Sequence, residues 1–264
     1  VAGFGDRIVV TAGTKCHLYD TKNFITPTIF ELPLELVLFT SLAPNYAYFA
    51  LSSGQTRIVS FDLHGKQIGT VKLPFQSVNQ RLFSASWETM ACVDAANPRV
   101  CQFYDAVTGK ETTVYRHAND IQRIGLNYSR GVKSRKLAFC DANKDLWVVC
   151  LATGVGKRVT AMANSFIWHE TLDVLAYSAS NRLSVLYSPN ALAHDAKLIA
   201  NATVHENIAG RCELTEFNDC QLCSINERNV SLIHQINSFA LRLIRAITEG
   251  TNAETTNHAC IRLA

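Results

Sequence analysis

The chain has 264 residues, of which 48% are hydrophobic and 18% charged, and its formal net charge is +3. So small a charge argues against nucleic acid or an anionic membrane surface as the main partner, while the apolar content allows a large buried core. No apolar stretch approaches the ~20 residues that a membrane-spanning helix needs.

In chain order, three short apolar runs end in an aromatic–aspartate pair, at Tyr19-Asp20, Phe61-Asp62 and Tyr104-Asp105. The three aspartates are spaced 42 and 43 residues apart. A period of this size is typical of a four-stranded propeller blade, in which a Trp-Asp pair commonly closes the third strand. The spacing therefore predicts an all-β, WD40-type β-propeller, and with it a protein that works through its surfaces.

Each repeat centres on a predicted hairpin, in which an apolar strand, a short polar turn and an alternating strand follow one another. Gly-Lys pairs at residues 65–66, 109–110 and 156–157 predict outer turns, because Gly reaches the positive φ that such a turn needs. Six blades are recognised from their hairpins: Arg7–Ala12 with Lys15–Asp20, Tyr46–Leu51 with Arg57–Asp62, Thr89–Asp94 with Arg99–Asp105, Lys136–Cys140 with Asp145–Cys150, Val174–Ser178 with Arg182–Ser188, and Gln221–Ile225 with Val230–Gln235.

Innermost strands are predicted ahead of four hairpins, at Leu36–Thr40, Arg81–Ser86, Ile121–Asn127 and Phe166–His169. No such strand is recognised before the first hairpin, so the first blade is predicted to be truncated. The stretch from Val1 to Asp6 shows no signal-peptide pattern, and we interpret it as an internal cut through a longer protein. Either upstream sequence completes the ring of blades or the ring stays open, and the sequence leaves both alternatives.

Strand patterns give way to a helical pattern near residue 238. Phe239–Ile247 has apolar residues at helical spacing, and Glu249-Gly250 predicts the end of that helix. A second short helix is predicted over residues 253–263. We therefore predict a β-propeller over residues 1–237 and a short α-helical segment, the start of a C-terminal helical repeat region, over residues 238–264.

The nine cysteines lie mostly within apolar strand patterns, where a free thiol behaves as a small hydrophobic residue. Their odd number and their positions favour a reducing compartment. Counting back from a turn at residues 95–98 pairs Cys92 with Cys101, and two packed free thiols are the preferred interpretation over a disulfide. Cys220 and Cys223 form a Cys-x-x-Cys that lacks the second ligand pair of a zinc site.

No catalytic motif is found in the sequence. The chain contains no P-loop, no Gly-x-Gly-x-x-Gly, no Gly-x-Ser-x-Gly and no His-Glu-x-x-His. The sequence therefore predicts a protein that is not an enzyme, with no catalytic, cofactor-binding or metal-ligating residues, no cofactor and no small-molecule substrate. His117 enters the fourth repeat and is expected to bond within its blade.

One basic run, Arg130-Gly131-Val132-Lys133-Ser134-Arg135-Lys136, precedes the middle strand of the fourth repeat. Its position predicts a loop between the inner and middle strands. Arg130, Lys133 and Arg135 are the candidate residues of a loop that binds an anion or an acidic partner on one propeller face. A solvated loop without a partner is the alternative interpretation.

Several stretches of the chain resemble one known family. They are similar to the second WD-repeat propeller of the eighty-kilodalton subunit of the intraflagellar transport B complex, together with the first helix after it. Between Gln235 and Phe239 the chain is shorter than the family pattern, so details of ring closure are not carried over. The matching stretches are Phe4–Leu32 (FGDRIVVTAGTKCHLYDTKNFITPTIFEL), Lys136–Leu146 (KLAFCDANKDL), Leu186–Leu198 (LYSPNALAHDAKL) and Phe239–Ile247 (FALRLIRAI).

The resemblance implies a non-enzymatic scaffold subunit of an intraflagellar transport train, needed for assembly of the cilium or flagellum. Such a subunit docks other subunits of the B complex through its propeller faces, and its helical tail is a candidate for self-association. The resemblance implies a location in the cilium and basal body on the cytoplasmic side, with no nucleic acid and no membrane insertion. A generic adaptor propeller of a vesicle-coat complex is the alternative, and a propeller enzyme with a site in the central channel is the third.

Overall fold

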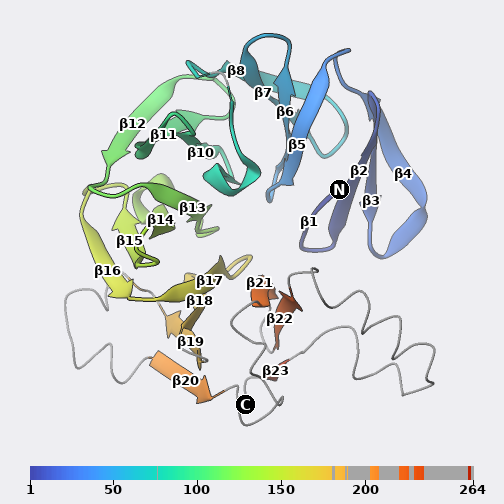
Figure 1. Ribbon diagram of the computed structural model, residues 1–264. Coiled ribbons are helices and arrows are strands. Elements are labelled where there is room, and N and C mark those ends of the chain that lie inside the picture. The colour runs from blue at the N-terminus through green and yellow to red at the C-terminus, as the bar shows by residue number, and fades with distance from the viewer. Residues whose placement is uncertain are drawn as a thin grey trace. The chain divides into compact units, whose positions relative to one another are not determined.

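The computed structural model describes residues 1–75, 77–179, 182–187, 189, 203–207, 220–225, 229–234 and 261–262. In these residues the strands form six sheets, five with four strands and one with three (Figure 1). The chain divides into two compact units, residues 1–142 with 151–154 and residues 143–150 with 155–264. The prediction of an all-β chain built from repeated four-stranded sheets is therefore confirmed.

The first unit contains three complete sheets, in each of which four strands follow one another in chain order. It also contains β13 (Ile121–Leu126) and β14 (Lys136–Asp141), which open the fourth sheet, and the short 3₁₀ helices η1 (Gln80–Leu82) and η2 (Val132–Ser134). The strands of the complete sheets are β1 (Ala2–Phe4), β2 (Arg7–Ala12), β3 (Lys15–Asp20) and β4 (Asn23–Glu31); β5 (Leu36–Leu42), β6 (Tyr46–Ser52), β7 (Thr56–Asp62) and β8 (Gln67–Lys72); and β9 (Phe83–Ser86), β10 (Thr89–Asp94), β11 (Asn97–Asp105) and β12 (Glu111–Arg116).

The second unit continues the same pattern. Its strands are β15 (Leu146–Cys150) and β16 (Gly156–Thr160) of the fourth sheet; β17 (Ala163–Trp168), β18 (Val174–Ala179), β19 (Arg182–Tyr187) and β20 (Thr203–Asn207); and β21 (Cys220–Ile225), β22 (Asn229–His234) and β23 (Ile261–Arg262). All six predicted hairpins are present within a residue or two of their predicted bounds.

The first sheet is complete, which corrects the prediction of a truncated first blade. Strand β1 pairs with β2, with Ala2 opposite Val9 and Phe4 opposite Arg7. A tight turn joins the two strands, and Gly5 adopts a positive φ of 54° in it. A strand of three residues is too short to show an alternating pattern, which explains why the sequence did not reveal it.

The first strands of successive sheets contact one another in the first unit. Contacts join β1 to β5, β5 to β9, and β9 to β13, and the remaining strands of each sheet lie progressively farther from this line (Figure 1). Each sheet therefore has two ends. We call the end that carries the connection from first to second strand the β1–β2 end, and the opposite end, which carries the connection from second to third strand, the β2–β3 end.

Aromatic side chains fill the space between neighbouring sheets of the first unit. Phe49 is fully buried, and its ring centroid lies 5.9 Å from that of Phe30 and 5.6 Å from that of Phe61. A second cluster joins Tyr48 of the second sheet to Phe83 of the third, with 6.0 Å between the ring centroids. The sheets are therefore held together by apolar burial, with offset and edge-to-face ring packing adding to it.

The repeated aspartates form the turns after the third strands. The Oδ1 atom of Asp62 accepts backbone N–H bonds from His64 (2.9 Å) and Lys66 (2.8 Å). Asp105 accepts bonds from the backbone of Val107 (3.0 Å) and from both the backbone and the hydroxyl of Thr108. Because a short carboxylate can satisfy turn N–H groups that lack a strand partner, the periodic aspartate has a structural cause.

These turn bonds shift the ionisation of both carboxyl groups. Backbone hydrogen bonds, that of Lys66 first, lower the pKa of Asp62. For Asp105, partial burial acts in the opposite direction, but the bonds from Thr108 and Val107 outweigh it and lower the pKa. A carboxyl group with a lowered pKa stabilises the folded state above its unfolded pKa of about 3.9, and this contribution is lost as the pH falls through the folded pKa.

We expect Asp105→Asn to lower the free energy of unfolding by about 1 kcal/mol near neutral pH, because a charge-assisted acceptor becomes a neutral one. The difference from the unmodified chain should shrink as the pH falls below about 3.9 toward the lowered pKa of the folded state, because the native carboxylate then becomes protonated as well. Urea unfolding in the two pH ranges measures this. Glu31→Gln, at an exposed position on β4, is the control. A difference that stays constant with pH would contradict the assignment.

Two local predictions need correction. In the outer turns, Gly65 and Gly109 have φ values of 85° and 70°, as predicted, but in the fourth repeat the positive φ belongs to Gly154 and Gly156 begins β16. In the third hairpin, Cys92 lies opposite Gln102, and Cys101 opposite Val93. A bulge after Val93 shifts the register, so the predicted Cys92–Cys101 pairing is wrong, although both thiols are free and buried as predicted.

The predicted helix at residues 239–247, with the self-association assigned to it, lies outside the described residues. Of residues 253–263, the structure describes Ile261 and Arg262, which form β23 and pair with β22, so the helix prediction does not hold at these two positions. None of the helices in the described part of the chain is long and apolar enough to cross a membrane.

Candidate functional site

The connection between β13 and β14 carries the predicted partner-binding residues, and it is a tightly bonded loop. The buried Asn127 amide donates to the carbonyl oxygen of Ser134 (3.0 Å) and accepts from the backbone N–H of Lys136 (2.8 Å). The Ser134 hydroxyl donates to the carbonyl oxygens of Arg130 (2.8 Å) and Gly131 (2.9 Å). Side chains from within the loop therefore satisfy its backbone, and its conformation is defined before any partner binds.

Arg135 is buried just before β14, so it is not available for the partner contact predicted for it. It is 2% exposed, and its Nη1 atom donates to the Ser86 hydroxyl and to the Asn127 carbonyl oxygen, both at 2.6 Å. Burial lowers the pKa of this guanidinium. The basic run alone could not show this, because Ser86, which accepts one of these bonds, belongs to the preceding sheet.

Arg130 and Lys133 are exposed at the β1–β2 end, as the sequence predicted for a surface loop. The guanidinium carbon of Arg130 lies 5.0 Å from the centre of the Trp87 ring, within cation–π range. Among the described residues, neither Arg130 nor Lys133 forms an ion pair with a carboxylate. These two side chains are therefore the exposed cations of the loop.

Three aromatic residues are linked to Arg130 through its contact with Trp87, and they were not identified as site residues from the sequence. The indole N–H of Trp87 donates to the carbonyl oxygen of Tyr128 (2.8 Å), and the Tyr48 hydroxyl donates to the carbonyl oxygen of Trp87 (3.0 Å). The ring centroids of Tyr128 and Phe4 lie 4.6 Å apart. We call Phe4, Trp87, Tyr128 and Arg130 together the Trp87 platform.

The repeat period could have revealed the platform. Phe4, Tyr46, Trp87 and Tyr128 follow one another at intervals of 42, 41 and 41 residues, and each lies at the connection between the first two strands of its sheet. Because the first strands of the four sheets contact one another, equivalent positions in these connections gather at one end of the unit. The aromatic–aspartate period was recognised in the sequence, but this second aromatic period was not.

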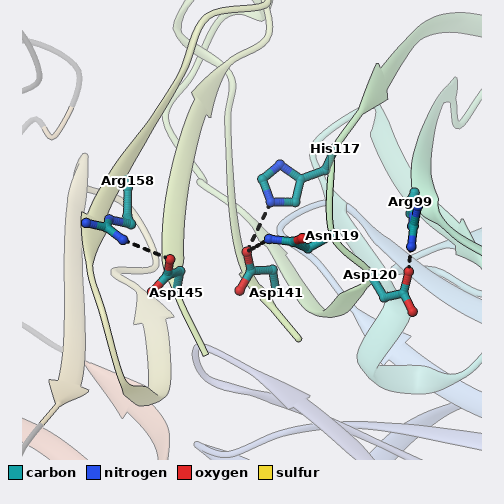
Figure 2. Close-up of polar contacts among 7 residues, drawn as sticks. All are labelled: Arg99, His117, Asn119, Asp120, Asp141, Asp145 and Arg158. Carbon is teal, nitrogen blue, oxygen red and sulfur yellow. Dashed lines mark hydrogen bonds and ion pairs between the residues drawn. The ribbon is translucent and has the colours of Figure 1, made fainter. Parts of the chain in front are cut away.

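A different polar cluster lies at the β2–β3 end, and Figure 2 shows it. The Oδ2 atom of Asp141 lies 3.2 Å from Nε2 of His117 and accepts a bond from the Asn119 amide (3.1 Å). The side chains of Asp141 and His117 are 0% and 7% exposed. This confirms that His117 bonds within its blade, where the cluster fastens the link before β13 to the end of β14.

Two further ion pairs are drawn in Figure 2, one exposed on both sides and one with a half-buried carboxylate. Arg99 pairs with Asp120 at 2.9 Å in the first unit, and Arg158 pairs with Asp145 at 3.1 Å in the second. A solvent-exposed pair such as Arg99–Asp120 contributes little to stability, typically about 0–1 kcal/mol. Both pairs satisfy charges at turns, and we assign them no binding role.

The described side chains offer little for nucleophilic or metal chemistry. Burial raises the pKa of the thiols of Cys16 and Cys140 to about 12, and raises the pKa of Cys92 and Cys101 further. Thiols with such values stay protonated at neutral pH, and a protonated thiol is a poor nucleophile. Across the described ranges, no group of three or more His, Cys, Asp or Glu side chains is placed to hold a metal ion.

Comparison with known proteins identifies close likenesses over most of the chain. The sequence model of the family described as the IFT80 second beta-propeller matches residues 3–239. The intraflagellar transport protein 80 homologs of Rattus norvegicus and Mus musculus are each 27% identical to the chain over 214 residues. That alignment covers 77% of the chain and 27% of each relative, so the chain spans about a quarter of their length.

Solved structures share the fold at low sequence identity. The computationally designed Ika8 protein has a TM-score of 0.53 and 12% identity, over 88% of this chain and 66% of that one. Kluyveromyces lactis Hsv2 has a TM-score of 0.53 and 17% identity, over 87% of this chain and 74% of that one. Together with the family match, these likenesses confirm the predicted WD40-type β-propeller fold.

Proposed function

The chain belongs to the family of the IFT80 second β-propeller, and from this membership we propose that it is a non-enzymatic docking module of an intraflagellar transport train. The observation that carries the proposal is the extent of the family match, which takes in residues 3–239. The protonated, buried thiols and the His117–Asp141 cluster, which serves the packing of the blade, support a role without catalysis.

Docking through the ends of the sheets is the proposed mechanism. A propeller presents loops on a rigid β framework, and loops held by such a framework commonly carry binding residues. The Trp87 platform and Lys133 form the proposed docking site at the β1–β2 end. We propose other subunits of the intraflagellar transport B complex as the partners, and the cilium and basal body as the location.

A domain boundary near residue 238 is also proposed, with the propeller over residues 1–237 and a helical region that begins at 238, although Ile261 and Arg262 return to the last sheet as β23. The end of the family match at residue 239 supports it. Limited proteolysis tests the boundary. A stable fragment that ends close to residue 238 is the expected product, whereas persistent cleavage well inside the first unit would contradict it.

We expect the 264-residue chain, fused to a biotin ligase in ciliated cells, to label intraflagellar transport B subunits and to concentrate at the cilium base and along its length. The physical reason is that a docking module stays within reach of its neighbours in the train. Quantitative mass spectrometry and light microscopy measure the two results. The ligase alone is the control.

Removal of residues 1–237 from the full-length protein should in addition shorten or abolish cilia, and immunoblotting checks that the shortened protein persists. Labelling of vesicle-coat subunits in place of train subunits would contradict the proposal and favour a coat adaptor. Cilia of normal length, with the shortened protein present, would contradict a role in cilium assembly.

A further inference from the structure

The exposed cations at the β1–β2 end lack the carboxylate partners that surface cations often have. Arg130 stacks on Trp87 at 5.0 Å, and no carboxylate in the described residues pairs with Arg130 or with Lys133. By contrast, Lys22 pairs with Asp6 at 2.8 Å and Arg57 pairs with Glu35. An exposed guanidinium held by its ring contact is suited to a planar anion such as a carboxylate.

The platform is also preorganised at some cost to the backbone. Trp87 adopts a positive φ of 49°, which is uncommon for a residue with a large side chain. Its indole N–H and its carbonyl oxygen are both hydrogen-bonded, to Tyr128 and Tyr48, so the strained conformation is held from two sides. Strained residues of this kind cluster at binding sites, where they fix side-chain geometry.

The buried guanidinium of Arg135 adds positive charge close to the Trp87 platform. Arg135 is buried behind Trp87 on Ser86 and the Asn127 carbonyl oxygen, and its Nε atom has no hydrogen-bond partner. Glu88 is the acidic group whose charge acts on Arg135. Arg130, Lys133 and Arg135 thus place three cations in the connection between β13 and β14, and their summed charge favours a negatively charged ligand.

We propose that the Trp87 platform and Lys133 bind an acidic peptide segment of a partner protein. A glutamate or aspartate carboxylate accepts two N–H bonds from Arg130, and Lys133 binds a second carboxylate of the same segment. An apolar side chain beside them packs against the partly exposed rings of Tyr128 and Phe4. Trp, Tyr and Arg are the residues that most often dominate the affinity of protein interfaces.

A membrane surface is disfavoured as the ligand. Segments that bind anionic lipids typically present about four to eight basic residues together, whereas this site exposes two, one of which lies over the Trp87 ring. This inference rests on the proposed function, because only a docking module needs a partner surface. It adds that the partner surface is acidic.

The test uses the 264-residue chain and a fluorescein-labelled peptide of glutamate and aspartate residues with one central phenylalanine. A second peptide with every acid replaced by its amide is the control. We expect the acidic peptide to bind and the amide peptide to bind weakly. Arg130→Gln should weaken binding about tenfold, as expected for loss of a charge-assisted interaction at an interface. Lys15→Gln, an exposed cation at the β2–β3 end, should leave binding unchanged.

Urea unfolding shows whether Arg130→Gln leaves the fold intact, and Lys133→Gln provides a second variant on the same loop. The proposal is overturned if the acidic peptide does not bind, if the amide peptide binds equally well, or if neither variant weakens binding. Arg130-dependent binding to phosphatidylserine vesicles, without peptide binding, would assign the site to a membrane. Peptide binding by a chain that fails to label transport subunits would retain this inference and reject the proposed function.

Discussion

Replacing Phe49 with alanine is expected to lower the free energy of unfolding by about 3–5 kcal/mol, the usual cost of removing a buried phenylalanine ring. Phe49 is fully buried on β6, and its ring packs against Phe30 of the first sheet and Phe61 of its own. The substitution therefore leaves a cavity between two sheets that a rigid β framework cannot readily close. The midpoint of urea unfolding, followed by circular dichroism, measures the loss.

Phe24→Ala is the matched control for this prediction, because Phe24 lies on the outer strand β4 and is 57% exposed. Its removal should change the free energy of unfolding by less than about 1 kcal/mol. If Phe49→Ala lowered the free energy of unfolding no more than Phe24→Ala does, the packing between β4 and β6 would contribute little to stability. That result would contradict the assignment of the core.

The second large effect is expected for Asp141→Ala, which should cost about 3 kcal/mol because it removes one partner from a buried polar cluster. The His117 imidazole, which is 7% exposed, and the half-buried Asn119 amide would lose their shared acceptor. Asp141→Asn keeps an acceptor oxygen at the same place and should cost less. Urea unfolding of the unmodified chain and of the two variants measures this order of stability.

Asp120→Ala is the control for the cluster. Asp120 pairs with Arg99 in the same region, but its side chain is 49% exposed, so its loss should cost less than about 1 kcal/mol. If Asp141→Ala were no more damaging than Asp120→Ala, the cluster would be a surface feature and would not hold the link between the third and fourth sheets.

Local patterns were sufficient to predict most of the strands. The strand predicted at Tyr46–Leu51 is β6, one residue longer, and the hairpin of β2 and β3 has its predicted bounds. These strands could be predicted from the sequence because alternating burial and turn residues depend on only a few neighbouring positions. The same reasoning failed for β1, whose three residues are too few to show a period.

Register and side-chain direction depended on distant contacts. The bulge after Val93 places Cys101 opposite Val93, and a count from the turn could not show it. Arg135 was predicted as a loop contact because it belongs to the basic run just before the strand that begins at Lys136. It is buried because Ser86 and the Asn127 carbonyl oxygen accept its N–H bonds at a point where two sheets meet.

The amino-acid sequence by itself determined the repeat, its hairpins and the exposed positions of Arg130 and Lys133, since each of these depends on neighbours in the chain. Only the tertiary structure decided that Arg130 lies over Trp87, that Trp87 bonds to Tyr128 and that Tyr128 packs on Phe4, because these residues come from three different sheets. The physical reason is that the first strands of successive sheets pack together, which brings equivalent connections to one end whatever their separation along the chain.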